Sequence, residues 1–392
     1  MRLRKDILVG AVMLALAVAV VVTGLLLERA GGGRLRRALV VREMPGRPGW
    51  YETGMEVMDT DMRLEVAAPG VGPARKMLAA AVRSVQEVES RMSTFRPDSE
   101  ISRVNLLAAQ QPVKVSEWTM AVMRKSVEGS RLTGGAFDVA YAPLRTLWRR
   151  AERDGRVPSA DDISKTLESV GYTRLVLGQD TVRFTVPGME VDLGGVAKGY
   201  AVDRAADALR QAGAREALVD IGGNLRLIGE PSPGERWRVL VRPPPGAEER
   251  IVLALPACSV ATSGDYARYF KIGNQHFSHI IDPRTGRPIA NMSSVTIVAP
   301  EAVDTDVLST GVSVMGADAG LALVEKLPGV DCMVMVRQPD GTIGKRMSSG
   351  FARWVESATP EREPQGAAPG SGLRGTDGAQ RAAPASVQRE AR

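Results

Sequence analysis

The sequence predicts an α+β fold with mixed or antiparallel sheets and flanking helices. Stretches with helical spacing of apolar residues occur among short alternating stretches typical of strands, without a strict β-α-β order. The fractions of apolar residues (44%) and charged residues (24%) are ordinary for a globular protein. About 300 central residues are enough for one large domain or two smaller ones.

The first expected element is the apolar segment 7–27, which holds no charged residue and follows Arg4 and Lys5. Its length suits a helix that crosses the hydrocarbon core of a membrane. Neither a small-x-small cleavage site nor a lipoprotein cysteine follows it. We therefore expect one transmembrane helix as an anchor over 1–30, with a cleaved signal peptide as the alternative. Gly and Pro recur over 31–50, which indicates a flexible linker.

The net charge of +6 belongs to the start of the chain. Residues 1–50 hold nine basic and three acidic residues, which is +6, and residues 358–392 hold five and four, which is +1. The middle, 51–357, therefore carries −1. This distribution argues against nucleic-acid binding, because a basic groove spreads its charge over the folded surface. The composition of 358–392 predicts a disordered tail and leaves 51–357 as the folded domain.

The folded part begins with a helical pattern over 73–91 and a second one over 116–130, for which Ser116 is a suitable N-cap. A hairpin is expected where 174–177 and 181–186 alternate on either side of a polar turn. Further strands are expected at 217–220, 237–241, 251–255, 294–298 and 332–336, and further helices at 198–212, 306–315 and 318–326.

Four segments hold residue types that suit binding or catalysis. The segment 190–203 reads EVDLGGVAKGYAVD, which predicts a short strand, a turn at Gly194-Gly195 and a helix from about Ala197. Such glycines let a ligand approach the backbone, a helix N-terminus favours phosphate, and Lys198 adds a positive charge. The segment matches neither GxGxxG nor a P-loop, so an ordinary strand–turn–helix is the alternative.

Two further segments are loops. The segment 93–105, STFRPDSEISRVN, holds Ser99 and Ser102, and either serine could cap a short helix. The segment 134–138, GGAFD, suits a loop wrapped on a flat ligand, although its two glycines alone would explain a turn.

The fourth segment is the longest and includes ATSGDY at 261–266, SHIIDPRTGRP at 278–288 and the acidic residues Asp304 and Asp306. Asp306 and Thr310 are four residues apart on an expected helix, so their oxygen atoms face one way. Carboxylate, hydroxyl and carbonyl oxygens are the ligands that a hard cation such as Mg²⁺ prefers. A role of Asp304 or Asp306 as a helix N-cap is the structural alternative.

Together these segments resemble the ApbE family, the FAD:protein FMN transferases. The resemblance spans about residues 55–340 and rests on motifs that occur in order. They are MSTFRPDSEISRVN at 92–105, GGAFD at 134–138, DLGGVAKGYAVD at 192–203, IGGN at 221–224, ATSGDY at 261–266, SHIIDPRTGRP at 278–288, and the pattern from Asp306 to Thr310. The resemblance implies a two-lobed α+β fold that binds FAD in a cleft with a divalent cation, usually Mg²⁺.

The resemblance also implies roles for single residues. Contacts with FAD are implied for Met58, Phe95, Ala136, Phe137, Asp138, Asp192, Lys198 and Ile280. Metal binding is implied for Gly195, through its backbone oxygen, and for Asp306, Ser309 and Thr310. His279 is implied as the catalytic base. Two positions depart from the family pattern: Asp59 stands where Gly is usual, and Phe95 replaces the commoner Tyr and so lacks a phenol hydroxyl.

We therefore expect metal-dependent transfer of FMN from FAD to a Thr or Ser hydroxyl of an acceptor protein, with release of AMP. The resemblance implies acceptors that are flavoprotein subunits of exported or membrane redox complexes. It thus favours a single-pass protein of the cytoplasmic membrane with its domain on the periplasmic, outer side. Charge alone does not decide this orientation, because Arg residues flank both ends of the segment 7–27.

Two alternative functions use the same site: FAD binding without transfer, and FAD pyrophosphatase activity that gives FMN and AMP. A serine hydrolase built on Ser263, Asp265 and His279 is a weaker alternative, because the GxSxG pattern is absent.

Overall fold

The computed structural model describes residues 39–247, 249–264, 269–290 and 292–360. Contacts divide the chain into the units Met1–Val40 and Val41–Arg392. The expected anchor over 1–30 and almost all of the expected tail over 358–392 lie outside the described residues. Within the described ranges, no helix has both the length and the apolarity needed to cross a membrane.

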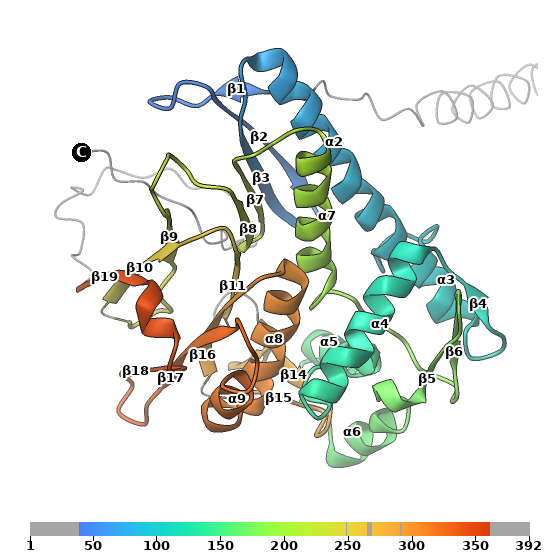
Figure 1. Ribbon diagram of the computed structural model, residues 1–392. Coiled ribbons are helices and arrows are strands. Elements are labelled where there is room, and N and C mark those ends of the chain that lie inside the picture. Colours follow the sequence, from blue (N-terminus) through green and yellow to red (C-terminus); the bar gives the residue numbers. More distant parts are fainter. Residues whose placement is uncertain (1–38, 248, 265–268, 291, 361–392) are drawn as a thin grey trace, which may run out of the picture. The chain divides into compact units, whose positions relative to one another are not determined.

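A nine-stranded sheet forms the centre of the unit Val41–Arg392 (Figure 1). Neighbouring strands pair antiparallel throughout, which confirms the α+β prediction. In spatial order the strands are β1 (Arg42–Glu43), β2 (Trp50–Val57), β3 (Thr60–Ala67), β7 (Ala217–Ile221), β8 (Asn224–Ile228), β11 (Ser259–Gly264), β16 (Met292–Ala299), β17 (Asp331–Arg337) and β18 (Ile343–Met347). The sheet thus starts within the stretch 31–50 that we expected to act as a linker.

Eight α-helices lie in the described part of the chain. They are α2 (Val71–Met92), α3 (Glu100–Leu107), α4 (Glu117–Leu132), α5 (Ala142–Asp154), α6 (Ala160–Leu167), α7 (Ala197–Gln211), α8 (Ala302–Met315) and α9 (Ala317–Val324). The helix predicted over 73–91 is confirmed as α2, and Ser116 caps α4 by accepting a hydrogen bond from the Thr119 N–H at 3.4 Å. Helix α8 begins at Ala302, before the start at 306 that the sequence predicted.

Side chains on the two faces of the sheet enter different cores. In β16, Val295 and Ile297 pack with residues of α8 and α9, whereas Val298 packs on the opposite face. In β17, Val334 packs with residues of α8 and α9, and Met333 packs on the opposite face. This alternation follows from the two-residue period of a strand, and it explains why both strands are apolar along most of their length.

A second, three-stranded sheet covers the face away from these helices. Its order is β19 (Val355–Pro360), β10 (Glu249–Leu255) and β9 (Trp237–Val241), so the predicted strands at 237–241 and 251–255 are confirmed. Trp237 of β9 meets Trp50 of β2 edge to face, with ring centroids 5.8 Å apart. Strand β19 extends the fold beyond 357, where we expected the domain to end.

Three small sheets complete the fold. They are β4-β6-β5, with β4 (Val113–Lys114), β5 (Leu175–Leu177) and β6 (Thr181–Phe184); β12-β13, with β12 (Tyr269–Ile272) and β13 (Gln275–Ser278); and β14-β15, with β14 (Ile281–Asp282) and β15 (Arg287–Pro288). Antiparallel pairing of β5 with β6 confirms the predicted hairpin. The division of the chain by contacts falls at Val40, so the two-lobed arrangement that the family resemblance implies for the domain stays a prediction.

Candidate active site

Two helices, α7 and α8, cross in close contact at Gly199. A Cβ atom on Gly199 would lie 2.2 Å from the carbonyl oxygen of Ala302, which leaves room for glycine alone. At this crossing the Gly199 N–H donates to Asp306 Oδ2 at 2.9 Å. The close approach therefore places the Asp306 carboxylate of α8 against the first turn of α7.

The second oxygen of Asp306 faces Lys198. The Lys198 ammonium lies 3.2 Å from Asp306 Oδ1 and donates to the Gly194 carbonyl oxygen at 2.8 Å. Asp306 is only 3% exposed, so its negative charge needs these donors in place of water. Residues from two of the predicted segments, 190–203 and 306–310, thus meet in one charged centre where α7 and α8 come together. Both helices are labelled in Figure 1.

Thr310 lies one helical turn after Asp306, on the same face of α8. A Cβ atom on Gly195 would lie 3.5 Å from Thr310 Oγ1 and 3.2 Å from the Phe137 ring, so the backbone of Gly195 passes beside both residues. The Asp306 carboxylate, the Thr310 hydroxyl and the Gly195 carbonyl are oxygen donors, and this donor set suits Mg²⁺. Among the residues described, no cluster of three or more His, Cys, Asp or Glu side chains offers another metal centre.

Ser309 supports the position of Asp306 from inside the fold. Its hydroxyl donates to the Asp306 carbonyl oxygen at 3.1 Å and accepts from Ser263 Oγ of β11 at 2.8 Å. Ser309 is completely buried, and both hydrogen bonds of its hydroxyl lie within the fold, so its metal-binding role stays a prediction. The Ser263 hydroxyl is engaged with Ser309, which argues against its use as a hydrolase nucleophile, and Asp265 lies outside the described residues.

The start of α8 is held by a residue that the sequence analysis missed. The Asp203 carboxylate, at the end of the DLGGVAKGYAVD motif in α7, accepts from the Ala302 N–H at 3.0 Å and the Val303 N–H at 2.8 Å. The structure thus corrects the suggestion that Asp304 or Asp306 is the N-cap, because α8 starts earlier and Asp203 supplies the carboxylate. Burial raises the pKa of Asp203 to about 6, while these hydrogen bonds and Arg226 oppose the rise.

Asp192 holds the loop that leads into α7. Its Oδ1 accepts from the Gly194 N–H at 2.6 Å, and its Oδ2 pairs with the Arg145 guanidinium. Next to it, the side chain of Asn105 accepts from the Val191 N–H at 2.8 Å and donates to the Val191 carbonyl at 3.0 Å. The Asn105 side chain therefore satisfies the backbone groups that a neighbouring strand would otherwise bond. Residues 190–193 form no strand, so the strand predicted there is wrong.

The segment 136–138 is buried beside this centre. Phe137 is 3% exposed, and its N–H donates to Thr133 Oγ1 at 3.0 Å at the end of α4. Ala136 is also buried. Asp138 accepts from the N–H groups of Ala140 at 2.8 Å and Tyr172 at 2.6 Å. Burial raises the pKa of Asp138 to about 6, and the two hydrogen bonds oppose the rise.

Met58 and Asp59 form a tight turn between β2 and β3. Met58 and Asp59 both have positive φ, 49° and 59°, and the Met58 N–H donates to Glu89 Oε1 at 2.8 Å. Asp tolerates this left-handed conformation better than most residues, which explains why Asp59 is accommodated where Gly is usual in the family. A Cβ atom on Gly222 would lie 2.6 Å from Thr60 Oγ1, so this turn lies beside the IGGN segment.

The other predicted residues lie on separate loops. Phe95 is 71% exposed, and the Arg149 guanidinium lies 5.9 Å from its ring centroid. Ile280 is buried, and its N–H donates to Ser278 Oγ at 3.2 Å. His279, the predicted base, lies between Ser278 and Ile280 in the chain and is half-buried. The structure thus gathers Gly195, Lys198, Asp306 and Thr310 with Phe137, but no described contact joins Phe95 to them.

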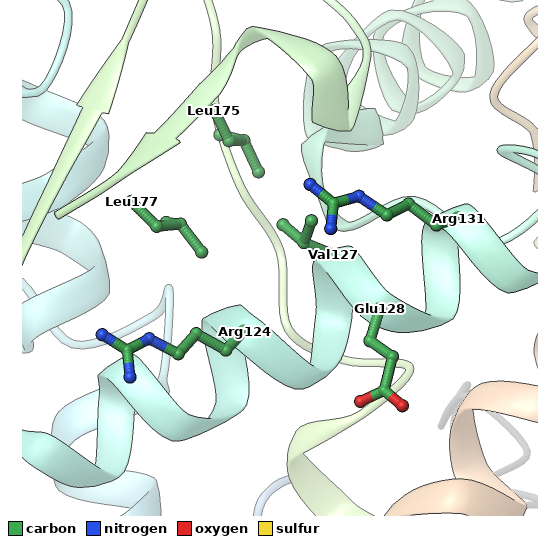
Figure 2. A pocket seen from close by; sticks show the side chains of 6 residues that line it. All are labelled: Arg124, Val127, Glu128, Arg131, Leu175 and Leu177. Carbon is green, nitrogen blue, oxygen red and sulfur yellow. The ribbon is translucent and has the colours of Figure 1, made fainter. Parts of the chain in front are cut away.

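A separate groove of about 340 Å³ lies between α4 and β5 (Figure 2). Arg124, Val127, Glu128 and Arg131 of α4 line it together with Leu175 and Leu177 of β5. None of these residues belongs to the predicted site, and Arg124 donates to the Gly178 and Gln179 carbonyls.

Comparison with known proteins decides the family. A family model described as the ApbE family matches residues 58–334, which is more than half of the chain. The chain belongs to the ApbE family. Family membership accounts for the motifs that converge on the α7–α8 crossing.

Curated relatives carry the name FAD:protein FMN transferase. The protein from Vibrio cholerae is 34% identical over 281 residues, which cover 70% of this chain and 84% of the relative. The protein from Haemophilus influenzae is 32% identical over 284 residues, which cover 70% and 82%.

Solved structures agree with these relatives. The flavin transferase ApbE from Vibrio cholerae matches with a TM-score of 0.69 and 31% identity, over 78% of this chain and 99% of that one. The apo form of the flavinyl transferase ApbE from Pseudomonas stutzeri matches with a TM-score of 0.69 and 28% identity, over 81% and 98%.

Proposed function

We propose that this chain transfers FMN from FAD to a Thr or Ser hydroxyl of an acceptor protein and releases AMP. The observation that carries the proposal is the α7–α8 crossing, where the Lys198 ammonium pairs with the Asp306 carboxylate and the backbone of Gly195 passes beside Thr310. Its residues come from the motifs that place the chain in a family whose curated members are FAD:protein FMN transferases.

Gly195, Asp306 and Thr310 would hold a divalent cation, for which Mg²⁺ is the best fit to an all-oxygen donor set. Such a cation would offset the negative charge of the FAD pyrophosphate. Lys198 lies in the same centre and adds a second positive charge for the phosphates. Phe137 fills the space behind Gly195, which keeps that backbone in position.

His279 is the proposed base. It accepts the proton of the acceptor hydroxyl, whose oxygen attacks the phosphorus atom of the FMN half. The bond from this phosphorus to the bridging pyrophosphate oxygen breaks, and AMP leaves with that oxygen. We propose further FAD contacts for Met58, Phe95, Ala136, Asp138, Asp192 and Ile280 from the family resemblance.

The test is mass spectrometry of an acceptor protein incubated with the enzyme, FAD and Mg²⁺. We expect the acceptor to gain the mass of a phosphate-linked FMN while an equal amount of AMP appears. Intact FAD bound to the protein after long incubation would support FAD binding without transfer. Release of FMN and AMP in the absence of an acceptor would support a pyrophosphatase.

The place of the reaction is also a proposal. The apolar segment 7–27 would hold the enzyme in the cytoplasmic membrane with the domain outside, where exported flavoprotein subunits of redox complexes are its acceptors. A periplasmic reporter fused after Arg392 should be active. A silent periplasmic reporter together with an active cytoplasmic one would reverse the orientation.

A further inference from the structure

Both oxygen atoms of the Asp306 carboxylate are engaged by α7. Oδ2 accepts from the Gly199 N–H at 2.9 Å, and Oδ1 lies 3.2 Å from the Lys198 ammonium. The Asp306 side chain is 5% exposed, whereas the Lys198 side chain is 26% exposed. The carboxylate is therefore fixed inside the crossing, and the lysine reaches it from the open side.

The Lys198 ammonium occupies a position that resembles a cation site. It touches the Gly194 carbonyl oxygen at 2.8 Å as well as the carboxylate, and the next peptide belongs to Gly195, one of the proposed metal ligands. A divalent cation bound at Asp306 Oδ1 would meet this ammonium within contact distance. Two cations on one carboxylate oxygen repel each other strongly in a site with little water.

We infer that Lys198 is a built-in placeholder for the divalent cation: it neutralises Asp306 in the metal-free protein and is displaced when the cation binds. The inference rests on the cation site of the proposed function. Gly199 keeps Asp306 in place during the exchange, because its N–H bonds the other carboxylate oxygen. The displaced ammonium is tethered at the first turn of α7, where the phosphates of FAD would arrive, so metal binding prepares the site for its anionic substrate.

A matched ion pair on the same helix provides the control. Lys125 of α4 lies 2.7 Å from Asp304 Oδ1, and these side chains are 28% and 31% exposed. The pair has the same charges as Lys198 and Asp306 and lies two residues away on α8. Asp304 is not one of the proposed metal ligands, so a divalent cation should leave Lys125 in place.

The first experiment measures lysine reactivity in the wild-type protein at fixed pH, without FAD. Reductive methylation followed by peptide mass spectrometry is compared with and without saturating Mg²⁺ or Mn²⁺, and binding of the cation is verified by calorimetry. We expect labelling of Lys198 to rise severalfold with the cation while labelling of Lys125 stays constant. Unchanged or reduced labelling of Lys198 with bound cation would overturn the inference.

The second experiment measures Mn²⁺ affinity in variants. Lys198→Met should bind Mn²⁺ about tenfold more tightly than wild type, and Lys125→Met should stay within about twofold. Lys198→Gln keeps a hydrogen-bond donor but removes the charge, so it should bind Mn²⁺ as tightly as Lys198→Met. It replaces Lys198→Met in the experiment if that variant does not fold. Equal or weaker affinity in both Lys198 variants would refute the placeholder. If neither wild type nor these variants bind Mn²⁺, the cation site fails as well, whereas the transfer assay with wild type tests the function separately.

Discussion

Two helices outside the site, α4 and α6, begin in a different way from the two helices at the site, α7 and α8. Helices α4 and α6 are each capped by their own serine, Ser116 and Ser159, within three residues of the bonded N–H. Helices α7 and α8 have no cap from their own N-cap side chain. Instead, the first turn of each helix donates to a carboxylate of the other helix. The Gly199 N–H of α7 donates to Asp306 of α8, and the Ala302 N–H of α8 donates to Asp203 of α7.

This difference shows how the site is assembled. A serine cap stabilises a helix wherever the helix lies, whereas the reciprocal carboxylates of α7 and α8 are satisfied only when the two helices cross. The positions of Lys198, Asp306 and Thr310 therefore depend on tertiary contact rather than on either helix alone. Changes at the crossing should cost more than equivalent changes at a locally encoded helix.

The largest effect on stability is expected from Gly199→Ala. The added Cβ would meet the backbone oxygen of Ala302 at 2.2 Å, and backbone cannot move aside without shifting α8. We expect a loss of about 3 kcal/mol in the free energy of unfolding, measured by urea denaturation. Gly72→Ala in α2 is the control, because nothing lies within 4 Å of its added Cβ. It should be neutral or stabilise by up to about 1 kcal/mol; similar losses in both variants would show that the crossing is not tight.

Asp203→Ala and Ser116→Ala compare the cap that α7 provides to α8 with the cap that α4 provides to itself. It removes two hydrogen bonds to the start of α8, so we expect a loss of about 2 kcal/mol in the free energy of unfolding. Ser116→Ala removes the local cap of α4 and should cost about 1 kcal/mol. Asp203→Ala should also weaken Mn²⁺ binding, because the start of α8 positions Asp306, while Ser116→Ala should not. Equal Mn²⁺ affinity in the two variants would mean that Asp203 is only a stabilising residue.

A smaller effect is expected from pH through Asp138. Its pKa is raised to about 6 in the folded protein from an ordinary value of 3.8, because burial disfavours the charged form. The folded protein thus binds this proton more tightly than the unfolded chain, and the stability that it gives is lost as pH rises from about 4 through 6. Between pH 5 and pH 7 this residue should lower the free energy of unfolding by about 1 kcal/mol.

Asp138→Asn measures that contribution. The amide loses one of the two acceptors for Ala140 and Tyr172, so the variant should be less stable overall. Its free energy of unfolding should nevertheless fall less between pH 5 and pH 7 than that of wild type. Parallel pH profiles for the two proteins would show that Asp138 has no raised pKa.

The sequence predicts the locally encoded parts of the fold well. The Ser116 cap and the β5–β6 hairpin follow from residues within a few positions of each other. The cap of α8 could not be found in this way, because Asp203 and Ala302 are 99 residues apart. The same reason explains the missing strand at 190–193, where Asn105 replaces strand pairing from 86 residues away.

The candidate site could be predicted from helix spacing together with the order of the family motifs. Spacing alone placed the oxygens of Asp306 and Thr310 on one helix face, but their pairing with Lys198 and Gly195 required the order of the family motifs. The reciprocal roles of Gly199 and Asp203 lie within the same DLGGVAKGYAVD motif, yet nothing in a single sequence says which of its residues face another helix.

We propose that FMN transfer takes place at the α7–α8 crossing. The most direct test compares Asp306→Asn with Asp304→Asn, two residues apart on α8, in the acceptor-mass assay with FAD and Mg²⁺. Asp306→Asn should lower the transfer rate at least about a hundredfold, as expected when a group that binds the reacting phosphates is lost. Asp304→Asn, which loses only its pair with Lys125, should keep a rate close to wild type. Transfer at the wild-type rate by a folded Asp306→Asn variant would show that FMN transfer does not depend on this crossing.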